Sequence, residues 1–243
     1  NGKEFKQYKL MDNGLELNSL LNLNWLYIDR EGILWEIGKK GKIFRYDQIH
    51  DNFVCVYKLP EEDYDNSPSP ISFSWLDNNN NIWLCNEKII SLYNTHTQKV
   101  VQVQNKLNEA ISDIEQIDST HFFIGTEMGL HHAKLENNTL ELLPCDKLDN
   151  IGIQINDLYF DPEICKLFIG TFQRGIMVYD MEIKSTIQPQ YSLTDISISR
   201  IKPFNKRELL VATDGGGVYK LNVDNYKTEP YIIADYNSNN EMN

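Results

Sequence analysis

A short sequence segment recurs five times in this chain, and the repeat restricts the folds that the chain can adopt. In each copy two apolar runs flank a tight turn. The copies read ILWEIGKKGKIFRYD at 33–47, NIWLCNEKIISLYN at 81–94, HFFIGTEMGLHHAKL at 121–135, KLFIGTFQRGIMVYD at 166–180 and ELLVATDGGGVYKLN at 208–222. Their equivalent positions, which we call the key residues, are Trp35, Trp83, Phe123, Phe168 and Leu210, separated by 48, 40, 45 and 42 residues. A period of about 44 residues is typical of the four-stranded blade of a β-propeller.

Each copy lies between two further strand-like segments. The preceding segments end in turn residues and read NWLYIDREG, ISFSWLDNNNN, ISDIEQIDST, INDLYFDPEIC and ISRIKPFNKRE. The following segments read FVCVYKLP, KVVQVQ, TLELLP, STIQPQYS and TEPYIIAD. Each unit is therefore predicted to contain four strands, and no segment reads as a helix. The central runs such as LFIG, FFIG and LLVA are almost wholly apolar, which predicts strands that are buried on both faces.

The predicted organisation is one all-β segment over residues 1–243 with five four-stranded blades. The blades are expected at 16–62, 63–106, 107–147, 148–193 and 194–238, after an orphan outer strand and linker at 1–15. The run EFKQYKL at 4–10 resembles an outermost strand, although the fifth unit already has its own. We therefore expect a fragment of a larger, seven-bladed propeller; a five- or six-bladed ring with an extra edge strand is the alternative. Unclosed blade edges invite pairing with another chain, so a homodimer is an open possibility.

Charge and composition limit the partners of this chain. Its formal charge is −12 and its pI is near 4.9, which argues against nucleic acid and against an anionic membrane surface. No apolar run approaches the roughly 18 residues of a membrane helix. The four cysteines, Cys55, Cys85, Cys145 and Cys165, show neither CxxC nor zinc spacing. Free thiols are expected, with a Cys145–Cys165 disulfide left open.

No residue pattern in the chain calls for catalysis, a cofactor or a metal. The Gly-Thr turns lack the phosphate-loop pattern and a following helix, so their glycines are expected to serve the turn. His131 and His132 are adjacent on a predicted strand and should point to opposite faces, which prevents them from chelating one metal together. Asp77–Asn81 resembles half of a calcium loop without its Gly and Glu, and is interpreted as a hairpin turn.

The stretch DREGILWEIGKKGKIFRYD at 29–47 resembles the two-component regulator propeller repeat, and FFIGTEMGL and LFIGTFQRGIMVYD resemble its I-G-T-x-x-G-L section. The likeness covers essentially the whole chain; the second copy lacks both turn glycines and the fifth has Ala212-Thr213. Such repeats build the extracytoplasmic sensor region of membrane-spanning hybrid histidine kinases. The resemblance implies a periplasmic, non-catalytic ligand-sensing segment of a membrane-anchored parent, with an oligosaccharide as the plausible ligand. A protein-interaction scaffold is the alternative, and a propeller lyase of the streptogramin-inactivating kind is a weaker one.

Propeller geometry indicates where a ligand would bind. The turns between second and third strands and the entries into successive blades are expected on one rim, around the central channel, where aromatic and polar side chains converge. Phe172 and Trp25 are candidates to stack on a sugar ring, and Arg174 and Arg200 to contact acidic or hydroxyl groups. The complete set of ligand-binding candidates is Trp25, Lys40, Asn156, Phe172, Gln173, Arg174 and Arg200.

Overall fold

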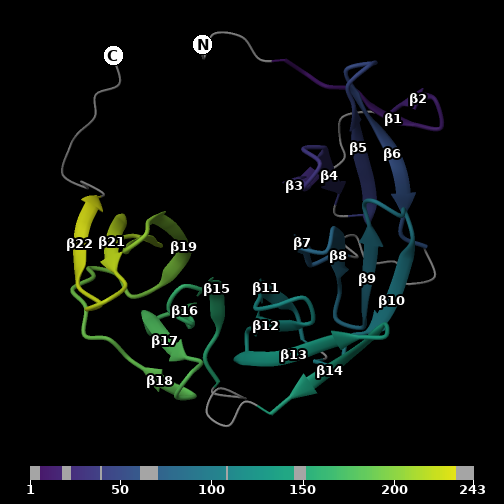
Figure 1. Cartoon of the computed structure of the whole chain (residues 1–243). Coiled ribbons are helices and arrows are strands. Elements are labelled where there is room, and N and C mark those ends of the chain that lie inside the picture. The colour runs from purple at the N-terminus through teal and green to yellow at the C-terminus, as the bar shows by residue number, and fades with distance from the viewer. Residues whose placement is uncertain are drawn as a thin grey trace, which may run out of the picture. The chain divides into compact units, whose positions relative to one another are not determined.

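The computed structural model describes residues 6–17, 23–38, 40–60, 71–107, 109–144 and 152–233, and within these ranges all regular structure is β-strand (Figure 1). The strands form five sheets, each with four consecutive antiparallel strands. This confirms the predicted fold class. The chain divides into two compact units, residues 1–110 and 111–243, which are described separately below.

The first unit holds the first two blades. The strands of the first blade are β3 (Leu23–Ile28), β4 (Leu34–Gly38), β5 (Lys42–Asp47) and β6 (Asn52–Lys58). Those of the second are β7 (Phe73–Leu76), β8 (Asn81–Cys85), β9 (Ile89–Asn94) and β10 (Val100–Gln104). In both blades each strand pairs antiparallel with the next one along the chain, as the repeat predicts.

The N-terminal segment joins the first sheet at its outer edge. The strand predicted over residues 4–10 is displaced, because residues 6–9 are not strand and β1 spans Leu10–Asp12. It pairs in parallel with β6, through Leu10 opposite Phe53, and turns back at Asn13-Gly14 into β2 (Leu15–Glu16). Both turn residues have positive φ, which favours Asn and Gly at these positions. The segment therefore extends the first blade.

The second unit holds the remaining three blades. The third comprises β11 (Ile111–Gln116), β12 (His121–Thr126), β13 (Leu130–Glu136) and β14 (Thr139–Leu143). The fourth comprises β15 (Ile155–Asp161), β16 (Lys166–Thr171), β17 (Ile176–Asp180) and β18 (Ser185–Ile187). The fifth comprises β19 (Ile198–Asn205), β20 (Glu208–Thr213), β21 (Val218–Asn222) and β22 (Thr228–Ile232). The first strands β11, β15 and β19 are neighbours within this unit (Figure 1).

Side chains along the second strand of a blade point alternately to the following blade and to the preceding one. The key residue Phe168 lies in one cluster with Leu209 and Val211 of the fifth blade, so it faces the following blade. Its neighbours Leu167 and Ile169 lie in another cluster with Phe123 of the third blade, so they face the preceding one. The first unit repeats this arrangement, because Trp35 shares a cluster with Ile82 and Leu84. Alternation along a strand thus fills both blade junctions from one apolar run.

Burial follows from this facing, with one departure from the prediction. β12 and β16 are buried on both faces over five of their six residues, as expected. In β20, by contrast, Leu210 and Ala212 are only half-buried. They face away from the fourth blade, and no further sheet among the described residues of the second unit covers them. Their exposure is the reason that the prediction of a doubly buried strand fails there.

An aspartate closes the first hairpin in both blades of the first unit. Asp29 accepts hydrogen bonds from the backbone N–H groups of Glu31 and Ile33 and from the Trp35 indole, at 2.8–3.0 Å. Asp77 does the same for Asn79, Asn81 and Trp83, at 2.8–2.9 Å. Asp77–Asn81 is therefore a hairpin turn, as interpreted from the sequence.

The remaining sequence expectations concern cysteines and membrane spans. Cys55, Cys85 and Cys165 are free thiols, and Cys145 lies outside the described residues. In the described part of the chain, no helix has the length and apolar character needed to span a bilayer.

Candidate functional site

Two sets of loops meet on one rim of the second unit, as the propeller geometry predicts. The β16–β17 turn bonds the entry of its own blade, through Phe172 N–H to the Gln154 carbonyl at 2.9 Å. It also bonds the entry of the next blade, through Gly175 N–H to the Ile196 carbonyl at 2.7 Å. In the fifth blade the backbone N–H of Asp214 makes the contact equivalent to that of Phe172, by donating to the Ser197 carbonyl at 3.0 Å. We call these turns and entries the rim.

The Gly-Thr element of the repeat shapes the rim turns. The Thr171 hydroxyl donates to the Gly175 carbonyl across the turn at 2.7 Å, and Thr126 and Thr213 make the same bond in the third and fifth blades. Gly175 has φ +72°, and a Cβ there would overlap the Tyr191 ring. Threonine and glycine thus build the turn itself, in agreement with the structural role expected from the sequence.

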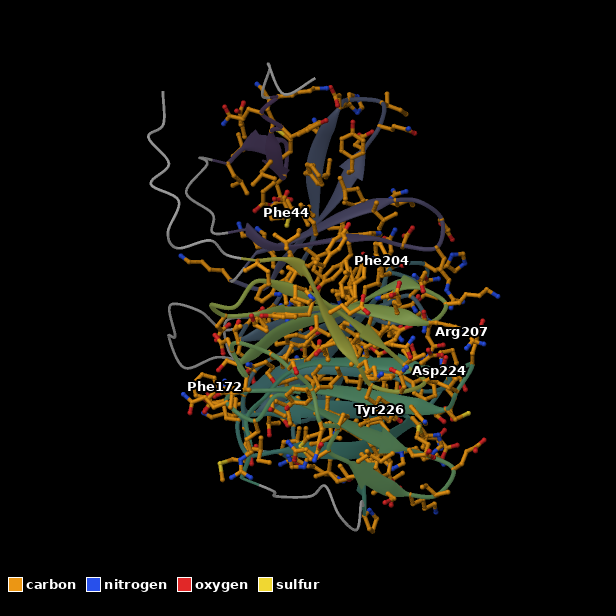
Figure 2. All side chains as sticks on the ribbon, turned by 90° about the vertical axis from the view of Figure 1, so that its left-hand side faces the viewer. Phe44, Phe172, Phe204, Arg207, Asp224 and Tyr226 are labelled. Atoms are coloured by element: carbon orange, nitrogen blue, oxygen red, sulfur yellow. The ribbon has the colours of Figure 1, made fainter. Side chains whose placement is uncertain are left out.

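Three ligand-binding candidates, Phe172, Gln173 and Arg174, lie in the turn of the fourth repeat copy and are exposed on this rim. Phe172 is 41% exposed, and Figure 2 shows it on the opposite side of the second unit from Arg207 and Asp224. Gln173 is exposed with φ +61°, and Arg174 is exposed with its carbonyl held by Tyr191 and Gln188. The backbone of this turn is therefore well fixed, while the three side chains reach solvent.

Asn156 and Arg200 come together through the carboxylate between them. The Arg200 guanidinium donates to Asp157 Oδ1 at 3.0 Å and to the Asn156 carbonyl at 3.4 Å. The Asn156 side chain donates to the Ile198 carbonyl at 2.8 Å and accepts from the Gln154 side chain. The backbone carbonyl of Gln154 in turn accepts from Phe172 N–H in the β16–β17 turn. Arg200 keeps 61% of its side chain exposed against 2% for Asp157. One hydrogen-bonded network thus links the rim candidates of the fourth and fifth blades.

Trp25 and Lys40 belong to the first unit. Trp25 is half-buried and packs against the cluster between the first and second blades, so much of its ring is used in the core. Lys40 is exposed in the β4–β5 turn. Both remain predictions of ligand contact, and the network described above does not include them.

The first strands of neighbouring blades are joined by a repeated pair of side chains. One member of these pairs, Asn156, was predicted from the sequence to contact a ligand. In the third blade the Ser112 hydroxyl donates to the Ile155 carbonyl, and Asp113 accepts from Leu158 N–H at 2.7 Å. In the fourth blade Asn156 and Asp157 make the same two contacts to Ile198 and Ile201, at 2.8 and 2.6 Å. The recurrence of a polar residue and Asp at equivalent positions, 112–113 and 156–157, was the available signal for this role.

The fifth blade replaces the junction aspartate with a cation. Arg200 stands at the position of Asp113 and Asp157, and it turns back to Asp157. Glu115 adds another junction carboxylate, which accepts from Phe160 N–H at 3.0 Å. The first strands β11, β15 and β19 therefore bring together three carboxyl groups, those of Asp113, Glu115 and Asp157, and the exposed positive charge of Arg200.

Burial perturbs these carboxyl groups. It raises the pKa of Asp113 to about 7, with a further rise from the Asp157 charge, although the Leu158 N–H opposes the shift. Burial likewise raises the pKa of Glu115 to about 7. The pKa of Asp157 is raised by burial too, against the N–H of Ile201 and the charges of Lys202 and Arg200.

A pH dependence of stability follows from Asp113. Because its folded pKa of about 7 exceeds the unfolded value of about 4, the folded state binds more protons in this window, and stability falls as pH rises through it. We expect Asp113→Asn to make the slope of unfolding free energy between pH 5 and 6.5 less negative by about 1.4 kcal/mol per pH unit, roughly one proton. Urea unfolding at a series of pH values measures it.

Asp118→Asn is the matched control. Burial raises its pKa, but hydrogen bonds from Thr120 and His121 N–H outweigh this and lower it to about 2, so its contribution changes only below the pH window. An unchanged slope in Asp113→Asn would contradict the assignment.

The two adjacent histidines lie on different faces of β13, as predicted. His132 stacks on Phe123 with ring centroids 4.9 Å apart, whereas His131 contacts the Thr126 hydroxyl. Among the described residues no group of three or more His, Cys, Asp or Glu side chains is placed to hold a metal ion.

Comparison with known proteins supports the fold. A scan of protein-family models and a search of curated proteins gave no match. Among solved structures, the extracellular domain of the hybrid two component system BT3049 from B. thetaiotaomicron matches 91% of this chain at 16% identity, with a TM-score of 0.66. U3-55K matches 89% at 11% identity, and the WD40 repeats of RRP9 match 87% at 11% identity, both with a TM-score of 0.63. The chain covers 30%, 69% and 63% of these three proteins. The chain therefore has a β-propeller fold, as the WD40 repeats of RRP9 do.

Proposed function

We propose that this chain is a non-catalytic, extracytoplasmic ligand-sensing propeller segment of a membrane-bound two-component receptor. The observation that carries the proposal is the match of 91% of the chain to the extracellular domain of the BT3049 hybrid two component system. The repeat resemblance supports the same receptor class. Since the chain covers 30% of that domain, transmission of the signal would depend on parts beyond this segment.

An oligosaccharide is the proposed ligand class, and the rim of the fourth and fifth blades its site. A sugar offers apolar ring faces and many hydroxyl groups. Phe172 presents an exposed ring, and Arg200 presents N–H donors whose orientation is set by the buried Asp157. The fixed turn backbone lowers the entropy that binding would cost.

A panel of neutral and uronic-acid oligosaccharides, read by melting temperature, tests this proposal. One glycan class is expected to raise the melting temperature by roughly 5–10 °C at a concentration about 100-fold above its Kd. Arg200→Ala and Phe172→Ala should each weaken binding about tenfold or more in calorimetric titration.

Arg207→Ala is the matched control, because Arg207 pairs with Asp224 on the opposite side of the unit (Figure 2). It should bind as the unmodified chain does. No response to any glycan would contradict the proposed ligand and favour a protein-binding scaffold.

A further inference from the structure

The charged residue at one position of the first strands changes sign between blades of the second unit. The position holds Asp113 in the third blade and Asp157 in the fourth, but Arg200 in the fifth. In each case it stands opposite the Gly or Ala that precedes the rim threonine. The two aspartates accept a backbone N–H of the next blade, which a guanidinium cannot do. Arg200 therefore replaces a junction residue with a cation at the rim.

The Arg200 guanidinium is only partly used within the protein. Its Nη1 donates to Asp157 Oδ1 at 3.0 Å and to the Asn156 carbonyl at 3.4 Å. In the described part of the chain no other hydrogen bond or ion pair engages it, and 61% of the side chain is exposed. Nε and Nη2 can therefore donate to a ligand. Two N–H groups on one guanidinium match the two oxygens of a carboxylate better than they match single hydroxyl groups.

Other charged groups lie on the same part of the rim as Arg200. Arg174 is exposed in the β16–β17 turn, whose backbone is hydrogen-bonded to the entry of the fifth blade. Asp195 lies in that entry, and Asp214 is exposed in the β20–β21 turn, which is bonded to the same entry. An anion held by Arg200 therefore lies among negative charges as well as a second cation. Its affinity depends on how many carboxyl groups of this region are ionised.

The carboxyl groups of the neighbouring first strands form one electrostatic unit with Arg200. Burial and, to a smaller extent, the Asp157 charge raise the pKa of Asp113 and of Glu115 to about 7, and the exposed Lys202 opposes this rise. Burial also raises the pKa of Asp157, while the charges of Lys202 and Arg200 oppose it. Near neutral pH the two carboxyl groups of the third blade are therefore partly protonated. Their ionisation responds to a charge that is added at Arg200.

We propose that the rim binds an anionic sugar through Arg200, and that this binding is coupled to the uptake of a proton from solvent by Asp113 and Glu115. The inference rests on the proposed function, because it specifies the ligand and the regulation of the same site. The ligand carboxylate neutralises the guanidinium and adds a negative charge beside the junction carboxyl groups. A unit charge on the order of 10 Å away shifts a pKa by about one unit at an effective dielectric constant of about 20. By linkage, the anion binds more tightly as pH falls through about 7, whereas a neutral sugar does not.

Calorimetric titration at a series of pH values from about 6 to about 8 tests the coupling, with uronate oligosaccharides and neutral oligosaccharides of the same length as probes. The uronate carboxyl group stays ionised above about pH 5, so a pH dependence in this range belongs to the protein. We expect the acidic probe to bind about fivefold more tightly at the acid end than at the alkaline end, and the neutral probe to change less than about twofold. Buffers of different ionisation enthalpy measure the proton uptake, which should be roughly half a proton near neutral pH.

The double variant Asp113→Asn/Glu115→Gln removes the two titrating groups and keeps an acceptor oxygen for each backbone N–H of the fourth blade. It should bind the acidic probe without pH dependence, at least as tightly as the unmodified chain does at the acid end. Asp118→Asn, which lies outside the rim, should behave as the unmodified chain does.

The outcomes separate this inference from the proposed function. Preference for the neutral probe, acidic binding without proton uptake, or a pH dependence that persists in the folded double variant would overturn the inference and leave the proposed function standing. No response to any probe would overturn both. Circular dichroism checks the folding of the double variant; if it does not fold, the proton uptake of the unmodified chain decides.

Discussion

Replacing Phe168 with alanine is expected to lower the free energy of unfolding by about 3–5 kcal/mol, the usual range for deleting a large, fully buried aromatic side chain. Phe168 has no exposed surface, and it packs between the fourth and fifth blades against Leu209 and Val211. The cavity would open at a junction held on both sides by sheets, which cannot collapse onto it without breaking strand pairs. Urea unfolding followed by far-ultraviolet circular dichroism measures the loss.

Phe172→Ala provides the comparison within the same repeat copy. Its ring is 41% exposed, so its removal should change stability by about 0.5 kcal/mol or less. All four tryptophans, Trp25, Trp35, Trp75 and Trp83, belong to the first unit. Their fluorescence therefore reports that unit, and reading it alongside circular dichroism assigns the loss. Equal losses for the two variants would mean that the key residue has no special place in the junction.

The strand pattern could be predicted from the sequence because a propeller blade is a local structure. Its four strands follow one another along the chain, and one apolar run per blade fills two junctions. The identity of Phe168 as a core residue and of Phe172 as an exposed one follows from that repeat alone. The N-terminal strand was misplaced because its partner β6 lies about 40 residues later, and its parallel pairing belongs to no repeat unit.

The site was predicted less completely, since its contacts cross blade boundaries. The sequence did not show that Asp113 and Asp157 would each accept a hydrogen bond from a backbone N–H more than 40 residues later. Asn156 and Arg200 were each predicted to contact a ligand, whereas the ion pair between Arg200 and Asp157 was not predicted. Polar residues that recur at equivalent positions indicate a junction, and those that change between copies, such as Phe172 and Arg174, remain free for recognition.

Asp77→Ala is expected to destabilise the first unit by about 2–4 kcal/mol, because it removes one carboxylate that accepts several hydrogen bonds in a buried place. Asp77 is 3% exposed and accepts from two backbone N–H groups, the Asn81 amide and the Trp83 indole. Alanine would remove the carboxylate oxygen to which the indole N–H of the fully buried Trp83 donates. Tryptophan fluorescence during urea unfolding measures the change where it occurs.

Two variants distinguish the indole bond from ordinary turn capping. Asp118 caps the equivalent turn of the third blade by accepting from Thr120 and His121 N–H, but it accepts no hydrogen bond from an indole, and its side chain is mostly exposed. Asp118→Ala should therefore cost only about 1 kcal/mol, as for an exposed cap. Asp77→Asn keeps one acceptor oxygen and should fall between the two. If Asp77→Ala cost no more than Asp118→Ala, the indole bond would contribute nothing to stability, and the six-residue spacing between Asp77 and Trp83 would reflect the turn alone.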